Sequence, residues 1–479
     1  MNGALLVCGT HSDAGKSVVA AGICRWLHRA GVSVAPFKAH NMALNSVVAA
    51  DGSEVGRSQA VQAAAAGAPL EAAMNPILIK PSGAHHSQVV VMGRQYADAD
   101  ARSYQALKDE LRPLVAGALA GLRERFDVVV CEGAGSPAEV NLRDGDLVNL
   151  GLARAAGLPV IVVADIDRGG VFASLLGTLA LLDAADQAHV AGFVINKFRG
   201  DASLLAPALA GLESLTGRPV LGVLPYVEDL WLDVEDSLAL DSRPPEAPAE
   251  AGTLDVAVVR LRWISNFTDV DALSAEPGVR VRFTRSPADV ERADLVVVPG
   301  TKATVEDLQR LRDAGLDRAL AARAVAGDPI LGVCGGYQLL GERIEDDIES
   351  RAGTVAGLGL LPVATTFAAN KLLRLRSGRC DWLRTAAAGY EIRHGRPRRH
   401  GGEPVLVADD GEPEGCRAGA VAGISWHGAL EHDAFRGALL RWVADIRARS
   451  FAPGATPFAA VRAARLDALG DLVERHLDT

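Results

Sequence analysis

Two segments near opposite ends of the chain carry residues whose types and spacing could do chemistry. Gly9-Thr-His-Ser-Asp-Ala-Gly-Lys-Ser17 has the glycines, the lysine and the serine of a phosphate-binding loop. Pro329-Ile-Leu-Gly-Val-Cys-Gly-Gly-Tyr-Gln-Leu-Leu-Gly341 sets one cysteine between an apolar strand and a helix. A nucleotide site alone is compatible with many functions. A nucleotide site and a nucleophilic thiol in one chain are compatible with few.

The first segment follows the apolar strand Ala4–Cys8 and precedes an amphipathic helix. Its glycines let backbone amides surround an anion, and the start of the helix adds a favourable dipole. Gly9 and Gly15 are separated by one residue more than in the usual loop. The alternative is a glycine-rich turn with a surface lysine. The residues that we expect to bind ATP are Thr10, Asp13, Ala14, Gly15, Lys16 and Ser17.

A carboxylate follows another buried strand of the same half. Glu132 comes directly after Asp127–Cys131, and ligands of open α/β sheets bind at the carboxyl ends of the strands. We expect the Ser17 hydroxyl and the Glu132 carboxylate to hold Mg²⁺ beside the triphosphate. The alternative for Glu132 is a residue that caps a loop.

Three further polar residues follow strands that end at this edge. Lys38 comes after Val34–Phe37 and could contact a phosphate or a substrate carboxylate. Asn196 and Lys197 follow Val190–Ile195, a common place for reading a nucleobase, and we expect them to contact ATP. Each signal is weak alone, and their shared edge strengthens all three.

The cysteine of the second segment is a candidate nucleophile. The elbow exposes the Cys334 side chain and directs the amides at the start of a helix toward it, which favours thiolate. An isolated cysteine is more often a buried structural residue, but flanking glycines indicate a close backbone approach. Gly335, and Gly300 in Pro299-Gly-Thr-Lys302, could supply amide donors for an oxyanion.

A thiolate nucleophile also needs a group that carries protons. Among the eleven histidines, His427 follows a short apolar strand and precedes a turn, with Glu431 four residues on. A lone histidine is more often a surface or core residue than a catalyst, but Cys334 favours a role in proton transfer. Glu431 is the only local guess for a carboxylate that orients His427.

Apolar runs alternate with helical patterns along the whole chain, which predicts an α/β fold with two doubly wound, mainly parallel sheets. We expect a P-loop domain over residues 1–240, a Pro-rich linker over 241–253, a second domain over 254–447 and a helical extension over 448–479. The expected strands are Ala4–Cys8, Val32–Phe37, Asp127–Cys131, Val160–Ala164, Val190–Ile195, Pro219–Val223, Leu254–Val259, Val279–Phe283, Leu295–Val298 and Ile330–Val333.

Composition excludes several classes of protein. The 479 residues carry a net charge of −10 and no dense Lys/Arg tract, so nucleic acid is not an expected partner. No stretch approaches a membrane span and no signal peptide is evident. The six scattered cysteines include no CxxC pair and indicate reduced thiols in a cytoplasmic protein.

The motifs resemble known families. The Cys334 elbow with His427 resembles the class I glutamine amidotransferases, and the loop with its extra residue resembles the dethiobiotin-synthetase-type P-loop fold. Together the two halves resemble the cobyric acid synthase family over nearly the whole chain. The stretches that carry this resemblance are Pro36–Met42, Asn75–Ser82, Glu132–Leu142, Asp167–Phe172, Asn196–Gly200 and Ser265–Asp269.

The resemblance implies an ATP-, Mg²⁺- and glutamine-dependent ligase. It would amidate the b, d, e and g carboxylates of adenosylcobyrinic acid a,c-diamide to give adenosylcobyric acid. Cys334 and His427 would release ammonia from glutamine. The candidates for holding the corrin carboxylates are Lys38, Lys80, Asp167 and Arg168. The implied partners are small molecules, and a homodimer is left open.

The sequence departs from the family pattern in places. His40 stands where the family has Gln, and Arg393-His394 follows Tyr-Glu-Ile where the family has a single His. In contrast, Ala429, two residues after His427, agrees with the branch of amidotransferases that acts on corrinoids, which lacks the Glu usual at that position. Two alternatives remain open: the sister ligase for the a and c carboxylates, and a MinD/ParA-like ATPase switch, which would not explain Cys334.

Overall fold

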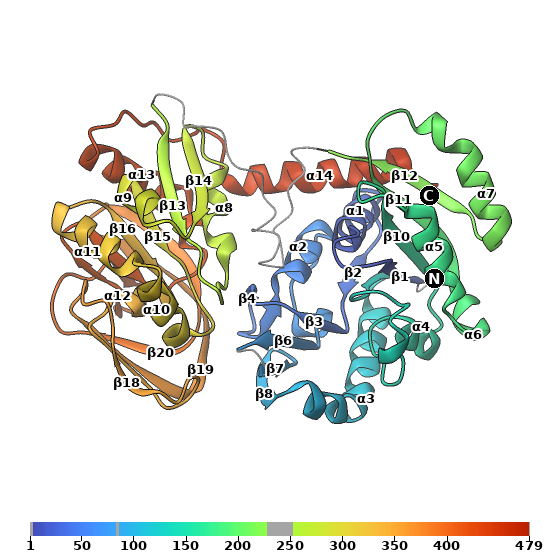
Figure 1. Cartoon of the computed structure of the whole chain (residues 1–479), viewed down its shortest axis with the longest axis horizontal. Helices are drawn as coiled ribbons and strands as arrows, with labels where there is room; N and C mark the ends of the chain where they lie inside the picture. Colours follow the sequence, from blue (N-terminus) through green and yellow to red (C-terminus); the bar gives the residue numbers. More distant parts are fainter. Residues whose placement is uncertain (1–2, 83–85, 228–251, 479) are drawn as a thin grey trace.

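The computed structural model describes residues 3–82, 86–227 and 252–478. They form two α/β domains side by side, with a long C-terminal helix lying across the first (Figure 1). Each domain is built around a six-stranded, mainly parallel sheet. The predicted fold class is therefore confirmed. Of the predicted linker, 241–253, only the last two residues fall within the described part of the chain.

The first sheet has the strand order β12-β11-β10-β1-β9-β2, and all its pairings are parallel. Its central strands are buried because helices cover both faces. Its strands are β1 (Gly3–Gly9), β2 (Val34–Phe37), β9 (Val128–Glu132), β10 (Val160–Asp165), β11 (Val190–Phe198) and β12 (Val220–Pro225). The helices of this domain are α1 (Lys16–Arg29), α2 (Arg57–Ala65), α3 (Ala101–Arg125), α4 (Leu150–Ala156), α5 (Val171–Ala180), α6 (Ala184–Gln187) and α7 (Ala206–Thr216), with 3-10 turns at Ala72–Met74, Val140–Leu142 and Ala202–Leu205.

Between β2 and β9 the chain forms an insertion that the sequence analysis did not predict. A four-stranded sheet of order β3-β6-β7-β8 and a separate β4–β5 hairpin lie on the side that faces the second domain (Figure 1). These strands are short, so they carry little periodic signal. They are β3 (His40–Met42), β4 (Ser46–Val48), β5 (Glu54–Gly56), β6 (Ile77–Pro81), β7 (Ser87–Val91) and β8 (Arg94–Ala99).

The second domain has a sheet of order β14-β13-β15-β16-β24-β23, parallel except at β23–β24. Its strands are β13 (Leu254–Val259), β14 (Val279–Thr284), β15 (Leu295–Val298), β16 (Ile330–Val333), β23 (Cys416–Ala418) and β24 (Val421–Ile424). Its helices are α8 (Asp271–Ser274), α9 (Pro287–Arg292), α10 (Thr304–Asp313), α11 (Leu316–Ala326), α12 (Gly335–Leu340) and α13 (Asp433–Ile446), with 3-10 turns η5 (Phe267–Val270) and η6 (Ala429–Glu431).

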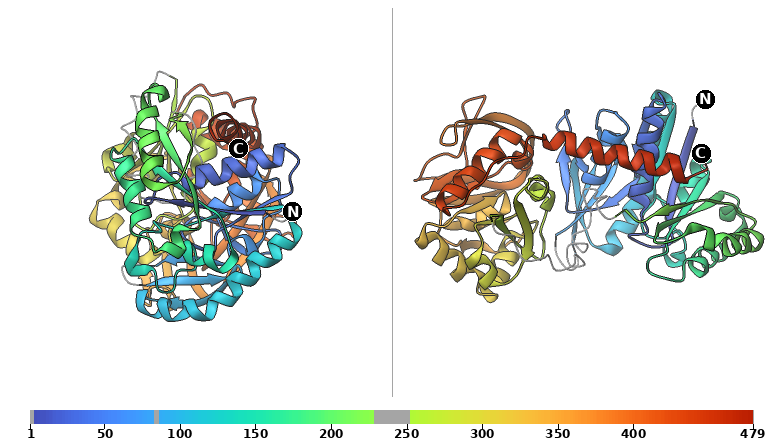
Figure 2. Two further views of the ribbon diagram at one scale, coloured as in Figure 1. Left: turned by 90° about the vertical axis from the view of Figure 1, so that its right-hand side faces the viewer. Right: turned by 90° about the horizontal axis from the view of Figure 1, so that it is seen from above.

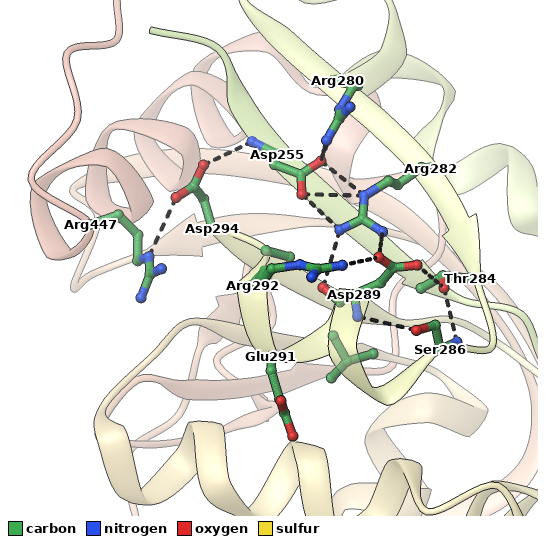
Figure 3. Close-up of polar contacts among 12 residues, drawn as sticks. Asp255, Arg280, Arg282, Thr284, Ser286, Asp289, Glu291, Arg292, Asp294 and Arg447 are labelled. Atoms are coloured by element: carbon green, nitrogen blue, oxygen red, sulfur yellow. Dashed lines mark hydrogen bonds and ion pairs between the residues drawn. The ribbon is translucent and has the colours of Figure 1, made fainter. Parts of the chain in front are cut away.

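A charged cluster stabilises the β14 edge of this six-stranded sheet (Figure 3). The Asp255 carboxylate accepts hydrogen bonds from Arg280 at 2.9 Å and from Arg282 at 2.8 Å. Arg282 also pairs with Asp289 on α9 at 2.9 Å. The two arginines stand two residues apart on β14, so they share one face of the strand. None of these four residues lines the cavity that contains Cys334. We therefore expect the cluster to stabilise the edge strand of the sheet.

The second domain also contains another sheet, built from β17 to β22, which extends toward the first domain. Its long hairpin, β19 with β20, contacts β4 through a buried apolar cluster of Val47, Val48, Tyr390 and Ile392. The domains are therefore packed against each other. The strands of this sheet are β17 (Arg343–Asp346), β18 (Gly353–Ala356), β19 (Val363–Cys380), β20 (Thr385–Arg399), β21 (Leu406–Ala408) and β22 (Pro413–Glu414).

The last helix, α14 (Phe458–His476), returns to the first domain and lies along α1 (Figure 2). Leu466, Leu469 and Val473 are buried in the same apolar cluster as residues of α1. Arg25 and Arg29 of α1 form ion pairs with acidic residues of α14. The predicted C-terminal helix is confirmed, and it docks on the domain that lies farther away in sequence.

Replacing Leu469 by Ala should destabilise the first domain. The side chain is 1% exposed, and the cavity left behind should lower the free energy of unfolding by about 2–5 kcal/mol. Guanidinium unfolding followed by circular dichroism measures the change. Val325 on α11 is 91% exposed, so Val325→Ala is the control and should shift the value by less than about 0.5 kcal/mol. Equal effects of the two changes would contradict the docking of α14.

Candidate active sites in the two domains

The phosphate-binding loop lies between β1 and α1 and is shaped by glycine. Gly15 has a φ of 103°, and a Cβ there would collide with the side-chain amide of Asn196. Asn196 donates a hydrogen bond to the Ala14 carbonyl at 3.0 Å. The structure therefore places Asn196 beneath the loop, where it supports the loop backbone.

Lys16 bends back over this loop. Its ammonium donates to the carbonyl oxygens of His11 and Gly135, both at 3.0 Å. Burial lowers the pKa of Lys16, although the nearby Glu132 charge opposes the change. The Thr10 hydroxyl is buried and has no hydrogen-bond partner among the described residues. A cation and an unused hydroxyl at a loop of backbone amides fit a bound phosphate group.

Glu132 is the buried carboxylate of this edge. It accepts hydrogen bonds from the Ser17 hydroxyl at 2.8 Å, from Lys38 at 3.0 Å and from Gln62. Burial alone would raise the pKa of Glu132, but the Lys38 charge and these hydrogen bonds hold it below the usual value. The carboxylate is therefore ionised.

The oxygens of Ser17 and Glu132 lie together as the ligand set for Mg²⁺ requires. Within the described ranges, no group of three or more His, Cys, Asp or Glu side chains could hold a metal alone. A Mg²⁺ ion at this edge would thus depend on phosphate oxygens for further ligands, as is usual for this ion.

The remaining predicted residues of this half lie at the phosphate edge, except Lys80, which lies on β6 of the insertion. Lys197 donates to the Asp13 carbonyl at 2.9 Å and to Asp165 at 2.7 Å, so it ties the loop to β10. Arg168 lies 3.5 Å from the Asp13 carboxylate, and Asp167 pairs with Arg199 nearby. These residues, like Lys38, lie at the edge that holds the phosphate loop. Lys80 does not.

Cys334 stands between β16 and α12 with φ 50° and ψ −108°, a strained conformation for a residue with a side chain. A Cβ on Gly336 would collide with the Val298 carbonyl, and one on Gly335 would lie 2.8 Å from the Thr301 nitrogen. The neighbouring strand end thus approaches so closely that only glycine fits. Strain at a cysteine held in this way indicates a functional elbow.

His427 lies beside this cysteine and is oriented by Asp269. Its Nδ1 is 2.7 Å from one carboxylate oxygen of Asp269, whose other oxygen accepts from the Gly428 amide at 2.8 Å. Burial alone would lower the pKa of His427, but the charges of Asp269 and Cys334 raise it to about 10. Because Nδ1 is held by Asp269, the other ring nitrogen is available to the sulfur.

The structure corrects the guess that Glu431 orients His427. Glu431 pairs instead with Arg57 at 2.7 Å and with Arg462 at 2.9 Å. Asp269, the orienting residue, ends the Ser265–Asp269 stretch that the sequence analysis noted without assigning a role to it. The arrangement of thiol, imidazole and carboxylate can carry out nucleophilic attack on a carbonyl carbon with proton transfer.

One cavity connects this triad with the first domain. Cys334, Gly335 and His427 line it, together with Lys80 from β6. Lys80 donates to Glu54 and to Ser46, both at 2.7 Å. A Cβ on Gly300 would lie 3.0 Å from the His427 ring, so the predicted oxyanion residue also lies at this site.

Two residues at which the sequence departs from the family pattern also lie at this cavity. Arg393 and His394 both line it. Arg393 is paired with Glu391, whereas the His394 ring contacts the Ala368 carbonyl at 2.9 Å and Gln88 of the first domain at 3.3 Å. His40 lies elsewhere, with its ring 5.3 Å from that of Tyr104.

Replacing Asp269 by Asn should lower the pKa of His427 from about 10 toward the ordinary value of about 6.5. The carboxylate charge that favours the imidazolium would be lost. Proton–carbon NMR of the histidine rings, with the His427 signal assigned from a His427→Asn spectrum, measures the midpoint. Glu431→Gln is the control and should leave it unchanged. A midpoint that moved with Glu431 rather than Asp269 would contradict the assignment.

Comparisons with known proteins agree with this division into two sites. Residues 5–239 match the CobQ/CobB/MinD/ParA nucleotide-binding domain, and residues 255–435 match the CobB/CobQ-like glutamine amidotransferase domain. No described helix is long and apolar enough to cross a membrane.

Relatives named cobyric acid synthase align over the whole chain. The protein of Frankia casuarinae is 60% identical, with 100% of this chain and 96% of the relative covered. Those of Saccharopolyspora erythraea and Streptomyces coelicolor are 56% and 55% identical, covering 99% and 100% of this chain and 93% and 95% of theirs. The chain belongs to the cobyric acid synthase family.

Proposed function

We propose that this protein uses ATP and glutamine to amidate the b, d, e and g carboxylates of adenosylcobyrinic acid a,c-diamide, giving adenosylcobyric acid. The observation that carries the proposal is the triad Cys334–His427–Asp269 in one chain with a phosphate-binding loop. The full-length relatives support the choice of substrate. A switch ATPase would have no use for the triad.

Ammonia is made at the thiol. The Cys334 thiolate attacks the side-chain amide carbon of glutamine, and backbone amides at Gly300 and Gly335 are placed to receive the negative oxygen. The His427 imidazolium gives its proton to the departing nitrogen as the carbon–nitrogen bond breaks, leaving a glutamyl thioester. His427 then takes a proton from water, whose oxygen displaces the sulfur and releases glutamate.

The carboxylate is activated at the other site, because a carboxylate is a poor electrophile. A corrin carboxylate oxygen attacks the terminal phosphorus of ATP, giving an acyl phosphate and ADP. Ammonia then attacks the acyl carbon, phosphate leaves and a proton is lost. Lys16 and the loop amides neutralise the transferring phosphoryl group. Ser17 and Glu132 would hold Mg²⁺, which supplies further charge neutralisation when bound.

Three residues at the phosphate edge are our candidates for the corrin carboxylates. Lys38 is next to Glu132, and Arg168 and Asp167 lie on the loop after β10 beside Asp13. The cations of Lys38 and Arg168 could pair with a carboxylate at this edge, and Asp167 precedes Arg168 on the same loop and pairs with Arg199. The ligands are small molecules, and we place the reaction in the cytoplasm.

Cys334→Ser should abolish glutamine-dependent amidation and leave amidation with added ammonium salts intact, since ammonia bypasses the thiol. Asp269→Asn should lower the glutamine-dependent rate by about 100-fold and leave the ammonium-dependent rate unchanged. Lys16→Ala should abolish both. Loss of both activities in Cys334→Ser would contradict the division of labour.

The substrate is tested by mass spectrometry after incubation with the a,c-diamide, ATP and glutamine. We expect a product in which the b, d, e and g carboxylates are all amides. Amidation of unsubstituted cobyrinic acid at a and c only, with no reaction of the a,c-diamide, would instead identify the sister ligase.

A further inference from the structure

The cavity at Cys334 contains charged side chains that the chemistry at the sulfur does not use. Lys80, Lys302, Lys371 and Glu349 line it together with Cys334 and His427. They come from four separate elements or loops, and Lys80 belongs to the other domain. A group of ammonium and carboxylate side chains beside a nucleophile is suited to a ligand that carries both charges.

The positive charges of this cavity exceed the negative ones. Glu54 is fully buried and serves two lysines, Lys80 at 2.7 Å and Lys371 at 2.5 Å. Glu349 pairs with Lys302. Among these five side chains there are therefore three cations and two carboxylates. A buried charge in excess is unfavourable unless a further partner neutralises it, so the cavity favours an anionic group.

Lys371 shares its carboxylate partner, Glu54, with Lys80. Its side chain is 6% exposed and reaches Glu54 and the Gln88 amide oxygen. The pKa of Lys371 is lowered to about 8, chiefly by burial; the charges of Lys80 and Lys302 contribute to the lowering, and Glu54 opposes it. Lys302 is thus close enough to Lys371 to repel it, and an anion between the two would relieve that repulsion.

We propose that Lys371 and Lys302 bind the α-carboxylate of glutamine and that Glu349 binds its α-ammonium group. The amide carbon then lies at Cys334, in the same cavity. This inference rests on the proposed function and names the groups that select an amino acid over a simple amide. Since Glu54 and Lys80 come from the first domain, the amino-acid site is complete only when both domains are joined.

The test compares two amides in the full-length protein, with release of ammonia as the readout. Glutamine is one, and 4-aminobutanamide, which lacks only the α-carboxylate, is the other. Lys371→Met should lower kcat/KM for glutamine about 10- to 100-fold, the effect of one charge-assisted hydrogen bond, mainly through KM. It should leave kcat/KM for 4-aminobutanamide unchanged. The preference for glutamine over the analogue should fall by the same factor.

Lys371→Met keeps Glu54 paired with Lys80, so the buried carboxylate retains a partner. The matched control is Arg379→Met, which removes a cation from the same strand β19 at a site where the side chain is 62% exposed. This control should leave kcat/KM unchanged for both glutamine and 4-aminobutanamide. Glu349→Gln should lower kcat/KM for glutamine. It should leave kcat/KM unchanged for 4-carboxybutanamide, which lacks only the α-ammonium group.

Three results would overturn the inference. Equal losses for glutamine and 4-aminobutanamide in Lys371→Met would mean a structural role. A raised KM for the corrin in ammonium-dependent amidation, with unchanged KM for glutamine, would mean a corrin subsite. An unchanged kcat/KM for glutamine would mean no contact with the carboxylate. The proposed function would stand in each case, because it fails only if the wild-type protein neither hydrolyses glutamine nor forms the amidated corrin.

Discussion

Glu54 lies fully buried where the two domains meet, and each domain supplies a lysine that pairs with its carboxylate. The same seam holds a second polar contact: the Asn266 side chain exchanges two hydrogen bonds with the Ser46 backbone, at 3.1 and 2.9 Å. Asn266 begins the turn that carries Asp269 to His427. Leaving a buried charge without any partner costs about 3–5 kcal/mol, so these contacts hold the thiol site against the nucleotide-binding domain.

The helix α2 shows how closely the two sites are connected. Gln62 donates to Glu132 at the phosphate edge, and Arg57, at the first turn of the same helix, pairs with Glu431 of the turn that follows His427. A nine-residue helix is about 14 Å long. One short rigid element therefore contacts both sites, and their separation is set by the backbone of that helix together with the seam at Glu54.

Features encoded by a few consecutive residues were predictable. The phosphate loop, the elbow at Cys334 and His427 each follow an apolar strand, and the strand pattern places them at sheet edges. Asp269 was not predictable in its role, since it is 158 residues from His427 and meets it only after the second sheet has formed. Glu431 is nearer in sequence, but the arginines of two other segments bind it.

The insertion and the long hairpin were missed for a related reason. The insertion strands are short, and in β19 the usual pattern is inverted, because Arg374 and Arg376 face the buried Glu391 while Leu375 is exposed. Lys80 illustrates the same limit. It ends a buried strand as other candidate lysines do, but the strand belongs to the insertion sheet and points to the seam instead of the phosphate edge.

The return of α14 to the first domain changes how the two domains can move. The chain crosses from the first domain to the second after β12, and crosses back before α14. The domains are thus joined by two covalent connections instead of one, and the second is held by the apolar face of α14. If either connection were cut, the other would keep the domains at high effective concentration. A hinge at one crossing could therefore open the seam only as far as the other crossing allows.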